Sequence, residues 1–142
     1  MMSNLDHLDV IDLISERHLQ LRGIIEEMWN ESSDLRVSNS EWFILARIYK
    51  KNPTIASISK SVDITRQATH KLVKSLEAKG LLVVQGAESN KKEKTVQLTA
   101  LGNTSYEEYL SIKDRVIEKI RRSIGNEKGS LLRELLEADW GI

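Results

Sequence analysis

Residues 54–80 read TIASISKSVDITRQATHKLVKSLEAKG, and this pattern predicts two short helices joined by a tight turn at residues 62–64. Thr54 and Thr65 are each placed to cap the start of one helix, and Gly80 suits the position just beyond the end of the second. Two helices joined in this way form a helix-turn-helix, whose second helix lies in the major groove in proteins that read DNA sequence. The stretch therefore predicts a DNA-reading unit.

The second of these helices has two chemically different faces. An apolar stripe at helical spacing predicts the side that packs in the core, formed by Thr69, Leu72, Val73 and Leu76. The opposite side carries side chains that can donate hydrogen bonds, namely Arg66, Gln67, His70, Lys71 and Lys74. We expect the first four to contact base edges or nearby phosphates, and Lys74 and the Thr65 amide to contact phosphates. The alternative is a solvated helix face that is basic by chance.

The segment that follows predicts a β-hairpin with a lysine-rich loop. Residues 81–85 and 95–98 have the composition of short strands, and the connecting GAESNKKEK at residues 86–94 is typical of a hairpin loop. We expect three lysines to reach phosphates or the minor groove beside the helix: Lys91, Lys92 and Lys94. Helix, turn, helix, strand, loop and strand in this order predict a mainly α fold, the α+β winged helix-turn-helix.

Charge is distributed unevenly along the chain. The 142 residues hold 21 Lys and Arg and 21 Asp and Glu, so the net charge is zero. Residues 54–98 nevertheless hold 8 basic and 4 acidic side chains and form a basic island between acidic flanks. Such an island favours binding to a polyanion, because each phosphate contact needs a local cation whatever the total charge. The alternative is ordinary surface charge that happens to cluster.

Composition and motifs exclude several other functions. The chain has no cysteine, which excludes disulfides, thiolate metal sites and cysteine nucleophiles. Its 3 histidines lie far apart in sequence, and we expect no metal and no cofactor. There is no phosphate-binding loop, dinucleotide turn or catalytic triad, so we expect no enzymatic activity. Apolar runs such as Leu81 to Val84 are too short for a membrane span, and nothing marks a signal peptide, so we expect a cytoplasmic protein.

One more helix is expected before the helix-turn-helix, over residues 41–49. Ser40 is a plausible N-cap for it, and Pro53 disfavours helix at the residue before it. The side chains expected to face inward are Phe43, Ile44 and Ile48, with Trp42 or Leu45.

The remaining helices carry more apolar surface than a winged-helix lobe of about 60 residues can cover. Apolar residues recur at helical spacing over residues 8–29 and again, after a cap at Thr99, over residues 100–123. A last amphipathic helix follows Gly125 and carries Leu131, Leu132, Leu135, Leu136 and Trp140. Burying these stripes is favourable against a partner surface, so we expect a homodimer with two-fold symmetry. The alternative is a monomeric helical bundle.

Over most of its length the chain resembles the multiple-antibiotic-resistance-regulator (MarR) family of bacterial winged-helix repressors. The resemblance runs through SNSEWFILARIYKKNP at residues 38–53, KSLEAKGLL at residues 74–82 and VQLTALG at residues 96–102. The last of these is similar to the family's LT-x-x-G segment after the wing. In the wing, Asn90 and Lys92 stand where the family usually has Asp-x-Arg; lysine keeps the positive charge and loses the planar fork of arginine.

The resemblance implies a single domain over residues 1–142 that forms an obligate dimer. A winged-helix lobe would cover about residues 37–99, and dimerisation helices would cover about residues 5–32 and 100–142. In many members of the family DNA affinity falls when a small molecule, often aromatic and anionic, binds between lobe and dimer helices. Residues that could line such an effector pocket are Arg17, His18, Arg22, Trp29 and Trp42. The alternative is that both tryptophans are core or interface residues.

The expected function is therefore that of a sequence-specific double-stranded DNA-binding transcriptional regulator, a repressor that a small-molecule effector can release. A dimer would present two recognition helices to a pseudo-palindromic operator, with half-sites about 10 bp apart. The alternative is a winged-helix module that binds a partner protein and no DNA. Binding to duplex DNA that weakens steeply with salt would distinguish the two.

Overall fold

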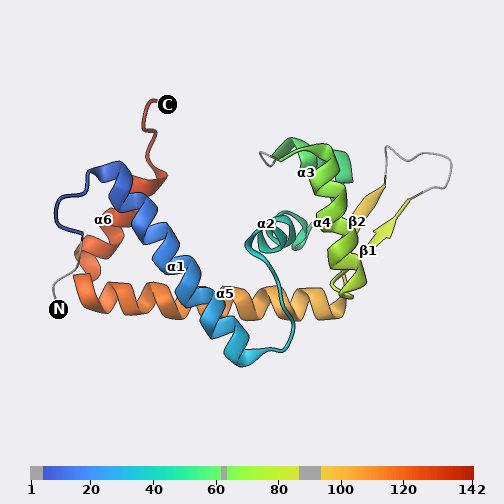
Figure 1. The fold of residues 1–142 in the computed structure, drawn as a ribbon, viewed down its shortest axis with the longest axis horizontal. Helices are drawn as coiled ribbons and strands as arrows, with labels where there is room; N and C mark the ends of the chain where they lie inside the picture. Colours follow the sequence, from blue (N-terminus) through green and yellow to red (C-terminus); the bar gives the residue numbers. More distant parts are fainter. Residues whose placement is uncertain (1–4, 62–63, 87–93) are drawn as a thin grey trace. The chain divides into compact units, whose positions relative to one another are not determined.

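The structure of the chain, a computed structural model, describes residues 5–61, 64–86 and 94–142. Within these residues it contains α1 (Val10–Ser32), α2 (Asn39–Ile48), α3 (Ile55–Ser61), α4 (Arg66–Ala78), β1 (Leu82–Gln85), β2 (Thr95–Leu98), α5 (Ala100–Ile124) and α6 (Asn126–Glu137) (Figure 1). The chain divides into two compact units: the lobe (Asn30–Tyr109) and the helical unit (Met1–Trp29 with Leu110–Ile142).

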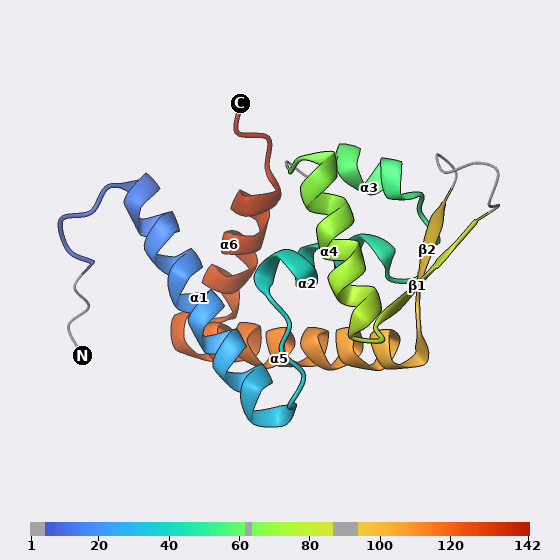
Figure 2. The same cartoon turned by 45° about the vertical axis from the view of Figure 1, so that its right-hand side comes forward.

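The lobe is built around α4, which packs against α2, α3 and β1 (Figure 2). Its core consists of side chains that are almost completely buried, among them Ile44, Leu45, Ile48, Ile58, Leu76, Leu81, Leu82 and Val96. They come from all three helices and both strands, so this core joins the helix-turn-helix to the hairpin. The predicted winged-helix fold class is confirmed.

The start of α2 differs from the prediction. Ser38, and not Ser40, is the N-cap: its Oγ accepts from the Glu41 backbone N–H at 3.1 Å, and Glu41 Oε1 accepts from the Ser38 backbone N–H at 2.9 Å. This reciprocal capping box satisfies two amides at once, and Ser40 offers no such pair because it lies within the helix. Phe43 also differs from the prediction, since it is exposed and the Arg47 guanidinium lies 3.7 Å from its ring centroid. Trp42 and Leu45 face the core in its place.

The predicted helix-turn-helix is present, although residues 62–63 of its turn lie outside the described residues. Thr54 caps α3 by accepting from the Ser57 backbone N–H at 3.0 Å, and Thr65 caps α4. Gly80 follows α4 with a φ of +77°, a left-handed conformation that glycine adopts without strain. The predicted caps and the terminating glycine are confirmed.

The hairpin pairs β1 with β2 in antiparallel register, from Leu82 opposite Leu98 to Gln85 opposite Thr95. A third extended segment joins the other edge of β2, because the Ile55 N–H donates to the Lys94 carbonyl and the Val96 N–H donates to the Pro53 carbonyl, each at 3.0 Å. The segment leading into α3 is therefore hydrogen-bonded to the base of the wing.

The helical unit contains most of α1, the second part of α5 and all of α6. The structure describes α6 in full and shows no buried residue in it, and in α1 only Trp29 is buried. Large apolar side chains of this unit are exposed on all three helices, among them Val10, Ile11, Leu19, Ile117, Leu131, Leu132, Leu135 and Leu136. No helix in the described part of the chain is long and apolar enough to cross a membrane.

Candidate nucleic-acid interface

Thr65 caps the first turn of α4, and the buried Thr69 shows which side of the helix faces the core. Thr65 Oγ1 accepts from the Ala68 backbone N–H at 3.0 Å, and the Thr65 carbonyl accepts from the Thr69 hydroxyl at 3.0 Å. Thr69 is completely buried, and Val73 and Leu76 continue the same buried stripe. Three of the four residues predicted to face inward are therefore buried, Leu72 is half-buried, and the opposite face is exposed to solvent.

All five side chains predicted to face DNA are exposed: Arg66, Gln67, His70, Lys71 and Lys74. They occupy about two and a half turns at the N-terminal end of the helix. Glu77, the only acidic residue in the sequence of α4, lies in its last turn. This face can donate hydrogen bonds to phosphate oxygens and to acceptors on base edges, and it carries positive charge toward either. The DNA contacts of the individual residues stay predictions.

Of the three predicted wing lysines, Lys91 and Lys92 lie outside the described residues. Lys94 is half-buried just before β2, where its carbonyl accepts from the Ile55 N–H at 3.0 Å. Gly86 lies against it, because a Cβ at Gly86 would be 3.1 Å from the Lys94 Cγ. Lys94 therefore stands at the base of the hairpin, and its backbone takes part in the pairing that holds the wing to α3.

At the C-terminal end of α4, a cluster of polar groups around the buried Glu41 joins the helix to α2. Glu41 is only 4% exposed, and its carboxylate accepts from the Lys79 ammonium at 2.7 Å and 2.9 Å and from the Ser75 hydroxyl at 2.9 Å. Lys79 Nζ also donates to the Arg36 carbonyl at 2.7 Å. Burial alone would raise the pKa of Glu41, but hydrogen bonds from Lys79, the Ser38 amide and Ser75 hold that pKa below its ordinary value. We call Glu41, Ser75 and Lys79 the α2–α4 cluster.

The stabilisation that Glu41 provides should depend on pH. Its pKa is lower in the folded protein than the ordinary value of 4.5, so the ionised cluster stabilises the fold above that pH and loses its effect as the pH falls below it. Glu41→Gln should therefore lower the Tm clearly at neutral pH and much less at an acidic pH below the folded pKa of Glu41. Thermal unfolding followed by circular dichroism at both pH values measures this. The exposed Glu77→Gln is the control, and an equal loss for Glu41→Gln at both pH values would contradict the prediction.

The residues suggested for an effector pocket fall in both units. Trp42, in the lobe, is buried and its ring is stacked on Tyr109, with centroids 4.0 Å apart and planes 5° apart. Tyr106 continues this aromatic cluster at 6.4 Å from Trp42. Tyr109 thus covers a face of the Trp42 ring, in agreement with a core role for this tryptophan.

The other four suggested pocket residues belong to the helical unit. Arg17 and His18 are exposed on α1, where Arg17 Nη1 donates to Gln20 Oε1 at 2.7 Å, and Trp29 is buried. Arg22 lies near Lys113 of α5: burial first and then the positive charge of Arg22 lower the pKa of Lys113. Whether these residues bind an effector stays a prediction.

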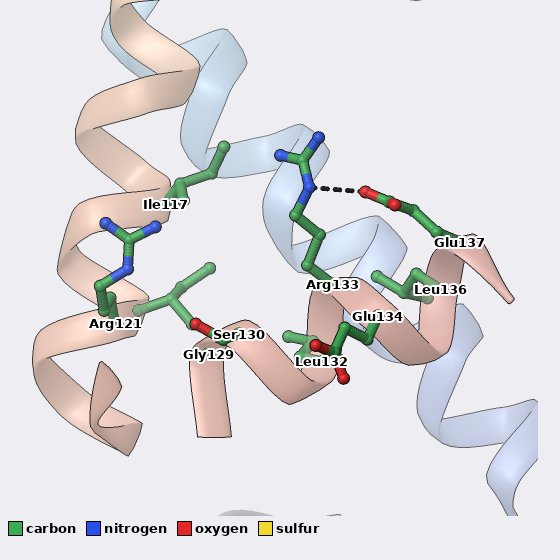
Figure 3. Close-up of a pocket in the computed structure, with 10 residues that line it drawn as sticks. Ile117, Arg121, Gly129, Ser130, Leu132, Arg133, Glu134, Leu136 and Glu137 are labelled. Atoms are coloured by element: carbon green, nitrogen blue, oxygen red, sulfur yellow. Dashed lines mark hydrogen bonds and ion pairs between the residues drawn. The ribbon is translucent and has the colours of Figure 1, made fainter. Parts of the chain in front are cut away.

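A cavity of about 560 Å³ lies elsewhere in the helical unit, between α5 and α6 (Figure 3). Its apolar lining comes from Ile117, Ile120, Leu132 and Leu136. Arg133 and Glu137 also line it, and the Arg133 Nε–H donates to Glu137 Oε1 at 2.6 Å. None of the residues suggested for the effector pocket lines it. Among the described residues, no three His, Asp or Glu side chains gather as a metal site would require.

The lobe also matches a known family in sequence. Residues 36–93 match the model of the MarR family. This match shows that the lobe is similar to the MarR family. The matched range includes α2, the helix-turn-helix and β1, and therefore the exposed cationic face of α4. The MarR family is one of transcription regulators. No curated protein sequence matches the chain significantly.

Solved structures share the MarR-type fold along almost the whole chain. FabT of Streptococcus pneumoniae, solved in complex with DNA, has a TM-score of 0.78 at 19% identity, over 89% of this chain and 90% of its own. MepR of Staphylococcus aureus, also solved with DNA, has a TM-score of 0.74 at 18% identity, over 92% and 95%. NadR, solved with 4-hydroxyphenylacetate, has a TM-score of 0.63 at 25% identity, over 96% and 95%. These matches extend beyond the lobe and include the helical unit.

Proposed function

We propose that the protein is a homodimeric transcriptional regulator that binds a specific double-stranded DNA operator and acts there as a repressor. The observation that carries the proposal is the exposed face of α4, the second helix of the helix-turn-helix. This face carries Arg66, Gln67, His70, Lys71 and Lys74. The match of residues 36–93 to the MarR family model and the fold shared with FabT and MepR, both solved on DNA, support it. A regulator of chromosomal genes works in the cytoplasm.

The exposed apolar surface of the helical unit supports the proposed dimer. The exposed apolar side chains of α1, α5 and α6 would carry a large cost in water, and a second copy offers a matching surface through two-fold symmetry. The DNA-binding part of the lobe would cover about residues 37–99. The flanking helices, at about residues 5–32 and 100–142, would form the dimer. Two copies of α4 would meet successive major-groove segments of a pseudo-palindromic site.

Each part of the lobe has a proposed role on DNA. Arg66, Gln67, His70 and Lys71 would reach base edges or adjacent phosphates, because they lie at the N-terminal half of the recognition helix. Lys74 and the Thr65 amide would bind phosphates, and the lysines at positions 91, 92 and 94 would extend the contact along the backbone.

Release from DNA would come from a small aromatic or anionic effector. NadR binds such a molecule, 4-hydroxyphenylacetate, and this chain has cationic and aromatic residues on α1 and α2 that suit the same chemistry. An effector that binds one arrangement of the two lobes more tightly lowers DNA affinity by its differential affinity for that arrangement. Arg17, His18, Arg22, Trp29 and Trp42 stay the proposed lining.

The decisive experiment measures duplex DNA binding by the Arg66→Ala, Lys71→Ala double variant. The probe is a duplex that the wild-type protein selects from a random-sequence pool. We expect an affinity loss of roughly a hundredfold or more, and a salt slope that becomes shallower by up to about 2, because each phosphate contact contributes about 0.9 to it.

The matched control is Lys119→Ala with Lys128→Ala, which removes the same charge from exposed positions of α5 and α6. It should bind DNA almost as well as the wild type. Wild-type affinity in the Arg66, Lys71 variant would remove these residues from the mechanism. A wild-type protein that selects no duplex would favour the alternative, a winged helix that binds another protein.

A further inference from the structure

The α2–α4 cluster lies at the C-terminal end of α4, whereas the residues predicted to contact DNA begin at its first turn. Glu41 belongs to the first turn of α2, Ser75 lies near the end of α4, and Lys79 is the residue at which α4 ends. Their hydrogen bonds span 34 residues of sequence between Ser75 and Glu41 and 38 between Lys79 and Glu41. These bonds fix the C-terminal end of the recognition helix against the start of α2.

Lys79 differs from the other lysines of α4 in what its ammonium group does. The Lys79 Nζ has three acceptors within 2.9 Å: the Arg36 carbonyl and both carboxylate oxygens of Glu41. An ammonium group has three N–H donors, so these contacts use its full donor capacity. Lys71 and Lys74 are exposed and can meet phosphates, whereas Lys79 serves the interior of the lobe.

Because the cluster holds the C-terminal end of α4, a change in it can displace the N-terminal end, which is the end predicted to contact DNA. A helix of 13 residues is about 20 Å long, so a tilt of about 5° at its C-terminus moves its N-terminus by roughly 1.7 Å. Hydrogen bonds to base edges tolerate only about 0.5 Å of displacement, while phosphate contacts made by long flexible lysines tolerate more. Loss of the cluster should therefore affect base reading before it affects general DNA affinity.

We propose that Glu41, Ser75 and Lys79 are positioning residues for sequence recognition: they hold α4 at the angle at which its N-terminal side chains meet base edges. This inference rests on the proposed DNA-binding function. A purely stabilising role explains the cluster less well, because a buried ion pair contributes little more to stability than apolar residues of similar size. Hydrogen bonds are directional, so this network of bonds favours one defined geometry between α2 and α4.

The test compares Glu41→Gln with Glu77→Gln. Both remove one negative charge from the lobe and should change general electrostatics alike, but only Glu41 belongs to the cluster. Kd is measured for the selected duplex and for a shuffled duplex of the same composition, well below the Tm of each variant. We expect the ratio of the two affinities to fall at least tenfold in Glu41→Gln, with the shuffled-duplex Kd within about twofold of wild type, and to stay unchanged in Glu77→Gln.

Lys79→Met is the second variant, since it keeps the aliphatic stem at the edge of the cluster and removes the ammonium. It should lose the same discrimination, and the Glu41→Gln, Lys79→Met double variant should lose no more than the worse single one, because the pair acts as a unit. Wild-type discrimination in both single variants would overturn the inference, as would an equal loss on both duplexes. A wild-type protein that binds neither duplex would overturn the proposed function itself, which is a different result.

Discussion

Gly102→Ala should destabilise the lobe by roughly 2 kcal/mol and lower the Tm by roughly 6 °C. A Cβ at position 102 would overlap the carbonyl oxygen of Leu81 and come within 3.2 Å of the Leu98 Cβ. The Leu81 carbonyl cannot swing away, because it accepts from the Thr99 N–H at 3.1 Å. The start of α5 must shift instead, and this strain outweighs the gain of about 1 kcal/mol that alanine brings to a helix.

Gly23→Ala is the matched control for this prediction. Gly23 lies within α1, and a Cβ there meets nothing within 4 Å in the chain. The substitution should therefore leave the Tm unchanged or raise it slightly. Thermal and urea unfolding of both variants measure the difference. A Gly102→Ala protein as stable as wild type would show that α5 can move away from Leu81 without loss.

The segment VQLTALG shows why the lobe could be predicted so well from sequence. Leu98 is buried, and the Thr99 hydroxyl accepts from the Gly102 N–H at 3.0 Å and donates to the Gly80 carbonyl at 2.6 Å. Gly102 allows the backbone of Leu81 to approach α5. Each of these requirements selects one residue type at one position, so the motif carries the geometry with it.

The two errors at α2 have equally local causes. Ser38 and Ser40 are both good capping residues, and only the glutamate three positions after Ser38 distinguishes them as an S-x-x-E capping box. Phe43 is apolar but adjacent to the buried Trp42 and Ile44, and a helix of 10 residues cannot turn every apolar side chain inward. The presence of the helix was predictable, and its exact rotation and start were not.

The candidate site also has one part that could be predicted from the sequence and another that could not. The exposed cationic face of α4 follows from helical periodicity, because burying Thr69, Val73 and Leu76 leaves the opposite side in solvent. The α2–α4 cluster has no such signal: Glu41 looks like a surface glutamate, and its partners are more than 30 residues away. The link between Pro53–Ile55 and β2 was likewise not predictable, since it pairs a loop with a strand 40 residues later.

If Leu132 and Leu136 of α6 lie in the proposed dimer interface, replacing both by aspartate should give a monomer. Both side chains are about half exposed in the single chain and line the apolar cavity between α5 and α6 (Figure 3). Charge at these positions costs little in the isolated chain, but in a dimer that buries them each aspartate would be desolvated without a partner. Mass measurement by light scattering should give about 16.2 kDa in place of twice that value.

The same variant should bind the selected duplex at least a hundredfold more weakly, because a monomer contacts one half-site and loses the effective concentration that the second lobe provides. Phe43→Asp is the control: Phe43 is 43% exposed on α2, outside the proposed dimerisation helices, and its replacement should leave the dimer intact. A variant at Leu132 and Leu136 that keeps the dimer mass would place the interface away from this part of α6. One that becomes monomeric yet binds DNA with full affinity would show that each lobe reads its site alone.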